Sequence, residues 1–100
     1  MILEVVVSQV IEGREAEFEE AHKKGAQILA RAKGYLGNEL RRCVETRGRY
    51  INLVKWETVD DHMVGFRGSP EYQEFRALIS PFYAVPTQME HYELIYQNPA

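Results

Sequence analysis

The chain has little cysteine and no long apolar run. Its single cysteine, Cys43, has no second thiol with which to form an intrachain disulfide or a paired metal or redox motif. The N-terminus lacks the basic segment and apolar stretch of a signal peptide, and no segment approaches the roughly 20 apolar residues that a membrane helix requires. These absences predict a protein of the reducing cytoplasm without a membrane partner.

A strong charge of one sign is also missing. Twelve Lys and Arg residues stand against 15 Asp and Glu residues, a net charge of −3, which gives no electrostatic reason to expect a nucleic-acid partner. The apolar fraction of 45% and charged fraction of 27% are those of an ordinary globular protein. One hundred residues are enough for one core, so residues 1–100 are expected to form a single domain.

The first half of the chain changes its apolar period twice. Residues 2–11 alternate and are rich in β-branched side chains, which predicts a strand. From Arg14 the apolar residues recur at three- and four-residue spacing, which predicts a helix ending near Gly34. Residues 35–44 and 50–56 then read as two strands joined by a short polar loop, hence as an antiparallel hairpin.

The second half carries two helix starts and one more strand. Thr58 precedes two acidic residues and is placed to cap a helix. Ser69 followed by Pro70 is typical of a second start, and Pro81 is expected to end that helix. Residues 89–96 are predicted to form the last strand.

The predicted order, β-α-β-β-α-β, is that of the ferredoxin-like α+β fold, in which helices cover one face of a four-stranded antiparallel sheet. The other face would expose apolar side chains over several strands, more than a monomer usually shows. We therefore expect a homodimer formed through the uncovered face.

The strand over residues 50–56 is the most informative segment. Side chains at alternate positions of a strand share a face. One face here would consist of Tyr50, Asn52, Val54 and Trp56. A polar amide on a covered face needs hydrogen-bond partners, which the protein, a water or a ligand can supply.

At this point the chain resembles a known family, the antibiotic biosynthesis monooxygenase (ABM) domain, a branch of the dimeric α+β barrels. The resemblance runs over most of the chain. It is densest in residues 52–58, His62, residues 69–70, residues 75–76 and residues 89–92.

Two branches of that family differ in the residues at comparable positions. In cofactor-free quinone-forming oxygenases, an Asn precedes a Trp by four residues, and a Tyr and an Arg follow the Trp by six and twenty. Counted from Trp56, these positions hold Asn52, His62 and Arg76, so only the Tyr is replaced. In the haem-degrading branch, a Trp is followed ten residues later by the iron-binding His. Phe66 and Arg76 stand there, and because arginine stays protonated, haem degradation is disfavoured.

The resemblance implies a cofactor-independent monooxygenase, an oxidoreductase that acts on a small aromatic or polycyclic phenol with dioxygen. Arg76 would stabilise a phenolate or enolate, and Asn52 would donate to a substrate carbonyl. Trp56 would offer its N–H and a flat wall, and His62 would handle protons. Each residue also has a simpler interpretation: an ion pair of Arg76 with a neighbouring acid, a core amide, core packing, or an ordinary helix histidine.

The aromatic wall of the expected pocket consists of Phe66, Tyr72, Phe75 and Phe82, although these residues could simply fill the interface between helices and sheet. The three histidines lie on three different elements without a paired spacing, so we expect no metal site. Two other functions stay open: a non-enzymatic protein that binds a small aromatic metabolite, and a cofactor-free isomerase.

Overall fold

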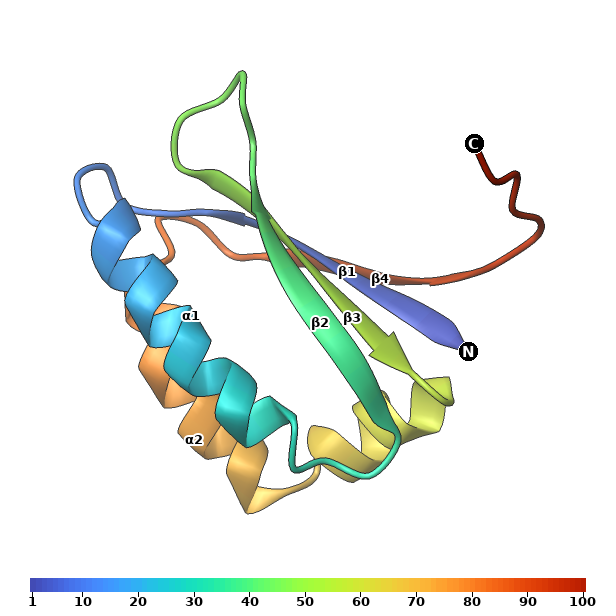
Figure 1. Ribbon diagram of the computed structural model, residues 1–100. Helices are drawn as coiled ribbons and strands as arrows, with labels where there is room; N and C mark the ends of the chain where they lie inside the picture. The colour runs from blue at the N-terminus through green and yellow to red at the C-terminus, as the bar shows by residue number, and fades with distance from the viewer.

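The computed structural model describes residues 1–100 and has the predicted order of elements (Figure 1). In chain order they are β1 (Ile2–Gln9), α1 (Glu15–Leu29), β2 (Tyr35–Arg42), β3 (Arg49–Trp56), a π-helix (Asp61–Phe66), α2 (Pro70–Ile79), a 3-10 helix (Ser80–Phe82) and β4 (Gln88–Glu93). The predicted ferredoxin-like α+β fold is confirmed.

The sheet has the strand order β2-β3-β1-β4, and every neighbouring pair is antiparallel. The register places Asn52 of β3 opposite Val6 of β1 and Leu40 of β2, and places Glu4 of β1 opposite His91 of β4. Directly opposite residues share a face of an antiparallel sheet. Asn52, Glu4 and His91 therefore lie on the same face of the sheet, on β3, β1 and β4.

Both long helices lie on one face of the sheet (Figure 1). The core between the layers contains Phe18 of α1, Tyr50 and Trp56 of β3, and Phe75 of α2, each at most 9% exposed. Gly25 of α1 allows the helices to approach closely, because a Cβ atom there would lie 3.1 Å from the Phe75 ring. The face that carries Asn52 is thus the covered one.

The π-helix is the main local difference from a regular second helix. Its start is capped as predicted, with the Thr58 hydroxyl accepting from the Asp61 amide at 3.1 Å. The Arg67 amide then donates to the His62 carbonyl, five residues earlier, at 2.9 Å. Single π turns occur often at functional sites. This turn buries His62 and Phe66 against the sheet and brings Arg67 over its covered face.

Several predicted ends were wrong by a few residues. Three strands are shorter than expected: β1 ends at Gln9, β2 at Arg42 and β4 at Glu93. Helix α1 ends at Leu29, and turns lead from there to Gly34, whose φ is +83°. Apolar periodicity continues past the last ladder or helix bond, so it overestimates element length.

The other face of the sheet has no helix over it (Figure 1). Its centre consists of partly buried apolar side chains at alternate positions of β1 and β3: Leu3, Val5, Val7, Ile51 and Leu53. The homodimer expected through this face stays a prediction. None of the helices is long and apolar enough to cross a membrane.

Candidate functional site

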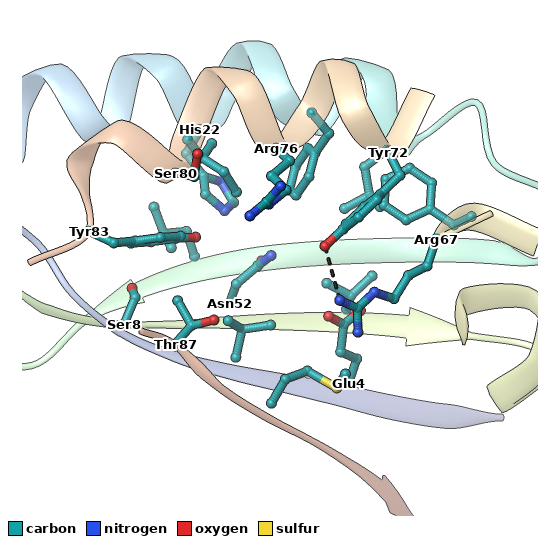
Figure 2. A pocket seen from close by; sticks show the side chains of 18 of the residues that line it. Glu4, Ser8, His22, Asn52, Arg67, Tyr72, Arg76, Ser80, Tyr83 and Thr87 are labelled. Atoms are coloured by element: carbon teal, nitrogen blue, oxygen red, sulfur yellow. Dashed lines mark hydrogen bonds between the residues drawn. The ribbon is translucent and has the colours of Figure 1, made fainter. Parts of the chain in front are cut away.

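A cavity of about 360 Å³ lies between the covered face of the sheet and the helices. That volume falls within the range of small-molecule sites, about 300–1,000 Å³. The strands supply its floor, α1 and α2 its roof, and the π-helix one end (Figure 2).

Six of the eight predicted site residues line this cavity: Asn52, His62, Phe66, Tyr72, Phe75 and Arg76. Two do not. Trp56 is completely buried behind the wall, and Phe82 packs beside Phe18 at 6.2 Å between ring centroids, under the guanidinium of Arg14. The expectation that these two rings face a substrate is therefore corrected.

Only one end of the Asn52 side-chain amide is hydrogen-bonded within the protein. Its Oδ1 accepts from Asn38 Nδ2 at 3.1 Å, and Asn38 in turn accepts from the Tyr35 hydroxyl at 2.5 Å. Asn52 Nδ2 makes no hydrogen bond within the protein, and it points into the cavity (Figure 2). The protein thus satisfies the acceptor of this amide and leaves a donor facing the cavity.

Arg76 points from α2 into the same cavity (Figure 2). Arg76 does not form an ion pair with a neighbouring acid. Glu74 instead pairs with Arg31 at 3.8 Å. A guanidinium and an amide N–H therefore face one space from opposite walls. Such a pair of donors suits an oxygen that carries or develops negative charge.

Trp56 contributes to the site indirectly, through a buried carboxyl group. Its indole Nε1 donates to Glu4 Oε1 at 2.9 Å, and His62 Nε2 lies 3.4 Å from the same oxygen. The other ring nitrogen of His62, Nδ1, lies 2.8 Å from His91 Nε2. The His62 ring also stacks on Trp56, with centroids 5.2 Å apart. These contacts form a polar chain that we call the Glu4–His62–His91 chain.

Burial acts in opposite directions on the two buried members of this chain. Glu4 is 7% exposed, and desolvation raises the pKa of its carboxyl despite the Trp56 hydrogen bond and the charge of Arg67. Desolvation lowers the pKa of His62 to about 4, and the neighbouring His91 and Arg67 add to that shift. His62 is therefore neutral near pH 7, with each ring nitrogen already beside a partner.

His22 of α1 is a second buried imidazole at the cavity. It is 4% exposed, and burial alone lowers its pKa to about 4. Unlike His62, it makes no hydrogen bond within the protein, and its ring packs against Phe18 and Phe75. Every fully enclosed polar side-chain atom of the protein has a hydrogen-bond partner. The His22 nitrogens have none, so they are not fully enclosed and are open to the cavity.

Two further polar groups close the ends of the cavity. Arg67 donates to the Tyr72 hydroxyl at 3.1 Å, and its guanidinium lies 5.1 Å from the centre of that ring (Figure 2). Tyr83 lies at the opposite end, where burial raises the pKa of its hydroxyl to about 12. The Tyr83 hydroxyl is therefore neutral near pH 7 and can donate or accept a hydrogen bond.

Four of these residues, Glu4, His22, Arg67 and Tyr83, were missed as site candidates in the sequence. The signal for Glu4 was present: it stands four residues before Ser8 in an alternating strand, so two polar side chains fall on a buried face. His22 follows Phe18 by four residues on the apolar face of α1. Arg67 carried no signal, because the π turn sets its direction.

The site therefore combines four chemical capabilities. It has an aromatic enclosure for a flat ring system, donors for a developing anion, a desolvated carboxyl with a raised pKa, and neutral imidazoles. Together they suit proton abstraction from a weakly acidic carbon or phenol and stabilisation of the resulting anion. No group of three or more His, Cys, Asp or Glu side chains is arranged to hold a metal ion.

The chain as a whole is similar to known proteins. The family model described as "Antibiotic biosynthesis monooxygenase" matches residues 1–78. An uncharacterized Bacillus subtilis protein, YczJ, is 43% identical over 93 residues, covering 93% of this chain and 98% of that protein.

Solved structures agree with this match. A crystal structure from Bordetella bronchiseptica, provisionally named an antibiotic biosynthesis monooxygenase, superposes with a TM-score of 0.92 at 40% identity and covers 95% of this chain and 97% of its own. SnoaB, a cofactor-independent oxygenase from Streptomyces nogalater, superposes with a TM-score of 0.79 at 20% identity, with 99% and 98% covered. At that identity the likeness to SnoaB extends to the fold alone.

Proposed function

Because the chain belongs to the antibiotic biosynthesis monooxygenase family, we propose that it is a cofactor-independent monooxygenase that oxidises a small aromatic or polycyclic phenol to a quinone. The observation that carries the proposal is the pair of unsatisfied donors, Asn52 Nδ2 and the Arg76 guanidinium, that face one aromatic-lined cavity. Both residues also stand at the positions expected from the quinone-forming branch.

In this reaction the substrate supplies the electrons. A base removes a proton from an anthrone-like CH₂ group, and the pair of electrons stays on the substrate as an enolate held by Asn52 and Arg76. The enolate gives one electron to dioxygen, and the substrate radical and superoxide combine to form a carbon–oxygen bond. The peroxide takes up a proton. Loss of the second C–H proton with departure of hydroxide then leaves a carbonyl and water, so that CH₂ and O₂ become C=O and H₂O.

The enclosure matters because the peroxide and radical would otherwise react with water or leave. Phe66, Tyr72 and Phe75 form apolar and aromatic parts of the wall. The Phe66 ring packs edge-to-face against Tyr72 and Phe75, with centroids 5.6 Å and 5.8 Å apart. A flat ring system inserted beside them would remain out of water while the anion exists.

The test is oxygen uptake with a panel of hydroquinones and anthrones, with and without a chelator. We expect chelator-independent turnover. Asn52→Ala and Arg76→Ala should each lower kcat/KM by about a hundred- to a thousandfold, the usual effect of removing one well-aimed donor. Arg31→Ala is the matched control, because Arg31 is an exposed arginine that pairs with Glu74 outside the cavity. Rates within twofold of the parent in both cavity variants would refute the assigned roles.

The same panel separates the two other candidate functions. Saturable quenching of the Trp56 fluorescence without turnover would indicate a binding protein. Product formation in the absence of oxygen would indicate an isomerase.

We also propose that two copies pair through the uncovered sheet face. Partly buried aliphatic side chains at its centre, among them Val5 and Leu53, support this proposal. Light scattering at micromolar concentration should give twice the chain mass for the parent, and Leu53→Lys should shift the protein toward monomer. A monomeric parent would remove the basis of the proposal.

A further inference from the structure

The cavity contains one carboxyl group, and its two oxygens have different surroundings. Glu4 Oε1 accepts from Trp56 Nε1 at 2.9 Å and lies 3.4 Å from His62 Nε2. Oε2 has no hydrogen-bond partner in the protein. Every fully enclosed polar side-chain atom does have a partner, so Oε2 is not fully enclosed. Oε2 is therefore the oxygen that is open to the cavity that Glu4 lines.

His62 cannot easily serve as the base that touches the substrate. Its Nε2 faces Glu4 and its Nδ1 faces His91, so both ring nitrogens are already engaged. His22 has free nitrogens but makes no hydrogen bond within the protein through which a proton could leave. Glu4 alone combines an oxygen open to the cavity with a polar path away from it.

That path runs toward the edge of the sheet. His91 lies directly opposite Glu4 on β4, which is the edge strand, and is only partly buried. His62 bridges the two, with 3.4 Å to the carboxyl and 2.8 Å to the His91 ring. Each step lies at or near hydrogen-bond distance, and a neutral imidazole can accept at one nitrogen while donating at the other.

We infer that Glu4 is the residue that takes the proton from the substrate, and that His62 and His91 connect this carboxyl to the edge of the sheet. The inference rests on the proposed function, because it assumes an aromatic substrate with an acidic C–H or O–H group. The substrate bond to hydrogen breaks, an O–H bond forms on Glu4 Oε2, and the electron pair remains on the substrate. Trp56 is a positioning residue, because it holds Oε1 and so turns Oε2 to the cavity.

Several charged and titratable groups face this carboxyl from the elements around it. They are His62 of the π-helix, Arg67 after it, His91 of β4 and Tyr83 beyond α2. Desolvation raises the pKa of Glu4. A carboxylate with a raised pKa is a stronger base than one in water, which suits abstraction from a weak acid.

The test follows proton abstraction without oxygen. 1,8-Dihydroxyanthrone is incubated anaerobically in D₂O, and NMR measures the loss of its methylene proton signal. The parent should accelerate this exchange, and Glu4→Gln, which keeps the shape and an acceptor for Trp56, should slow it by about a hundredfold or more. Glu12→Gln is the matched control, because it removes an exposed carboxyl just beyond the same strand.

A second measurement needs no variant. Trp56 is the only tryptophan and donates directly to Glu4, so its fluorescence reports the ionisation of that carboxyl in the ligand-free protein. The exchange rate of the parent should rise with pH at the same midpoint as the fluorescence change. A carboxyl with a purely structural role would not couple the two.

Each outcome decides the matter. Four results would overturn the inference. The first two are an exchange rate of Glu4→Gln within threefold of the parent rate, and midpoints of the exchange and fluorescence profiles that differ by more than one pH unit. The other two are loss of exchange in His22→Gln instead of Glu4→Gln, and no acceleration of exchange by the parent. Exchange without oxygen uptake in air would refute the oxygenase proposal and leave the role of Glu4 intact. Oxygen uptake that is insensitive to Glu4→Gln would refute the role of Glu4 and leave the oxygenase proposal intact.

Discussion

Lowering the pH from 7 to 5 is expected to destabilise the protein, and replacing His22 should remove about half of the effect due to histidines. Burial lowers the pKa of both His22 and His62 from 6.5 to about 4. In the unfolded chain these rings take up protons below about pH 6.5, whereas in the folded protein they stay neutral down to about pH 4. Stability is therefore present above pH 6.5 and is lost as the pH falls toward 4.

The size of the effect follows from those two values. Between pH 7 and pH 5, linkage gives a loss of about 2 kcal/mol in the free energy of unfolding for each histidine. Two histidines would cost about 4 kcal/mol, a large part of the roughly 5–15 kcal/mol that stabilises a typical domain. Glu4 has the opposite effect on the free energy of unfolding. Because its pKa is raised in the folded state, the folded protein binds this proton at a higher pH than the unfolded chain does, which favours folding as the pH falls.

The measurement is urea unfolding of the parent and of His22→Gln at both pH values, at one protein concentration. Because Glu4 and His62 contribute to both proteins, the difference between them isolates His22. The parent should lose about 2 kcal/mol more than the variant. Lys24→Gln removes an exposed charge from the same helix and should behave as the parent does. If the parent and His22→Gln lose the same free energy within about 0.5 kcal/mol, His22 does not reside neutral in the cavity.

Three further predictions concern the residues that hold the site in place. Trp56→Phe removes the donor to the buried Glu4 carboxyl and should lower the free energy of unfolding by about 1–3 kcal/mol in urea titrations. Gly34→Ala should lower the melting temperature much more than Gly13→Ala: both positions have positive φ, but only at Gly34 would a Cβ atom collide with a neighbouring side chain, at 2.2 Å. Ser69→Ala removes the α2 cap, a 3.4 Å contact, and should cost about 1 kcal/mol by thermal unfolding, with a change below about 0.3 kcal/mol counting against the cap.

The helix caps and the strand faces were predictable because they depend on local chemistry. Ser69 and Thr58 accept from backbone amides as their positions indicated. The alternation of β3 also held, with Asn52 and Trp56 both buried on one face. Period and capping act over a few residues, so sequence alone reveals them.

The roles within the site were less predictable because they depend on register and on a local irregularity. Trp56 was expected at the cavity wall, but the register of β1 and β3 brings Glu4 within reach of its indole, which takes up the N–H. The π turn brings His62 between Glu4 and His91 and carries Arg67 over the cavity. Neither contact is encoded in residue spacing along one element.

By itself, the sequence determined the order of the elements and which side chains of β3 share a face, because apolar periodicity selects which side chains leave water. The choice of Asn52 and Arg76 as site residues came from the resemblance to the family, and only the structure showed that the helices cover the face of Asn52. Only the tertiary structure decided which polar groups face one another. The Glu4–His62–His91 chain joins residues of β1, the π-helix and β4 that are far apart in the chain. Such a chain exists only when strand pairing and helix packing fix side-chain distances to within about an ångström, the precision that hydrogen bonds and proton transfer require.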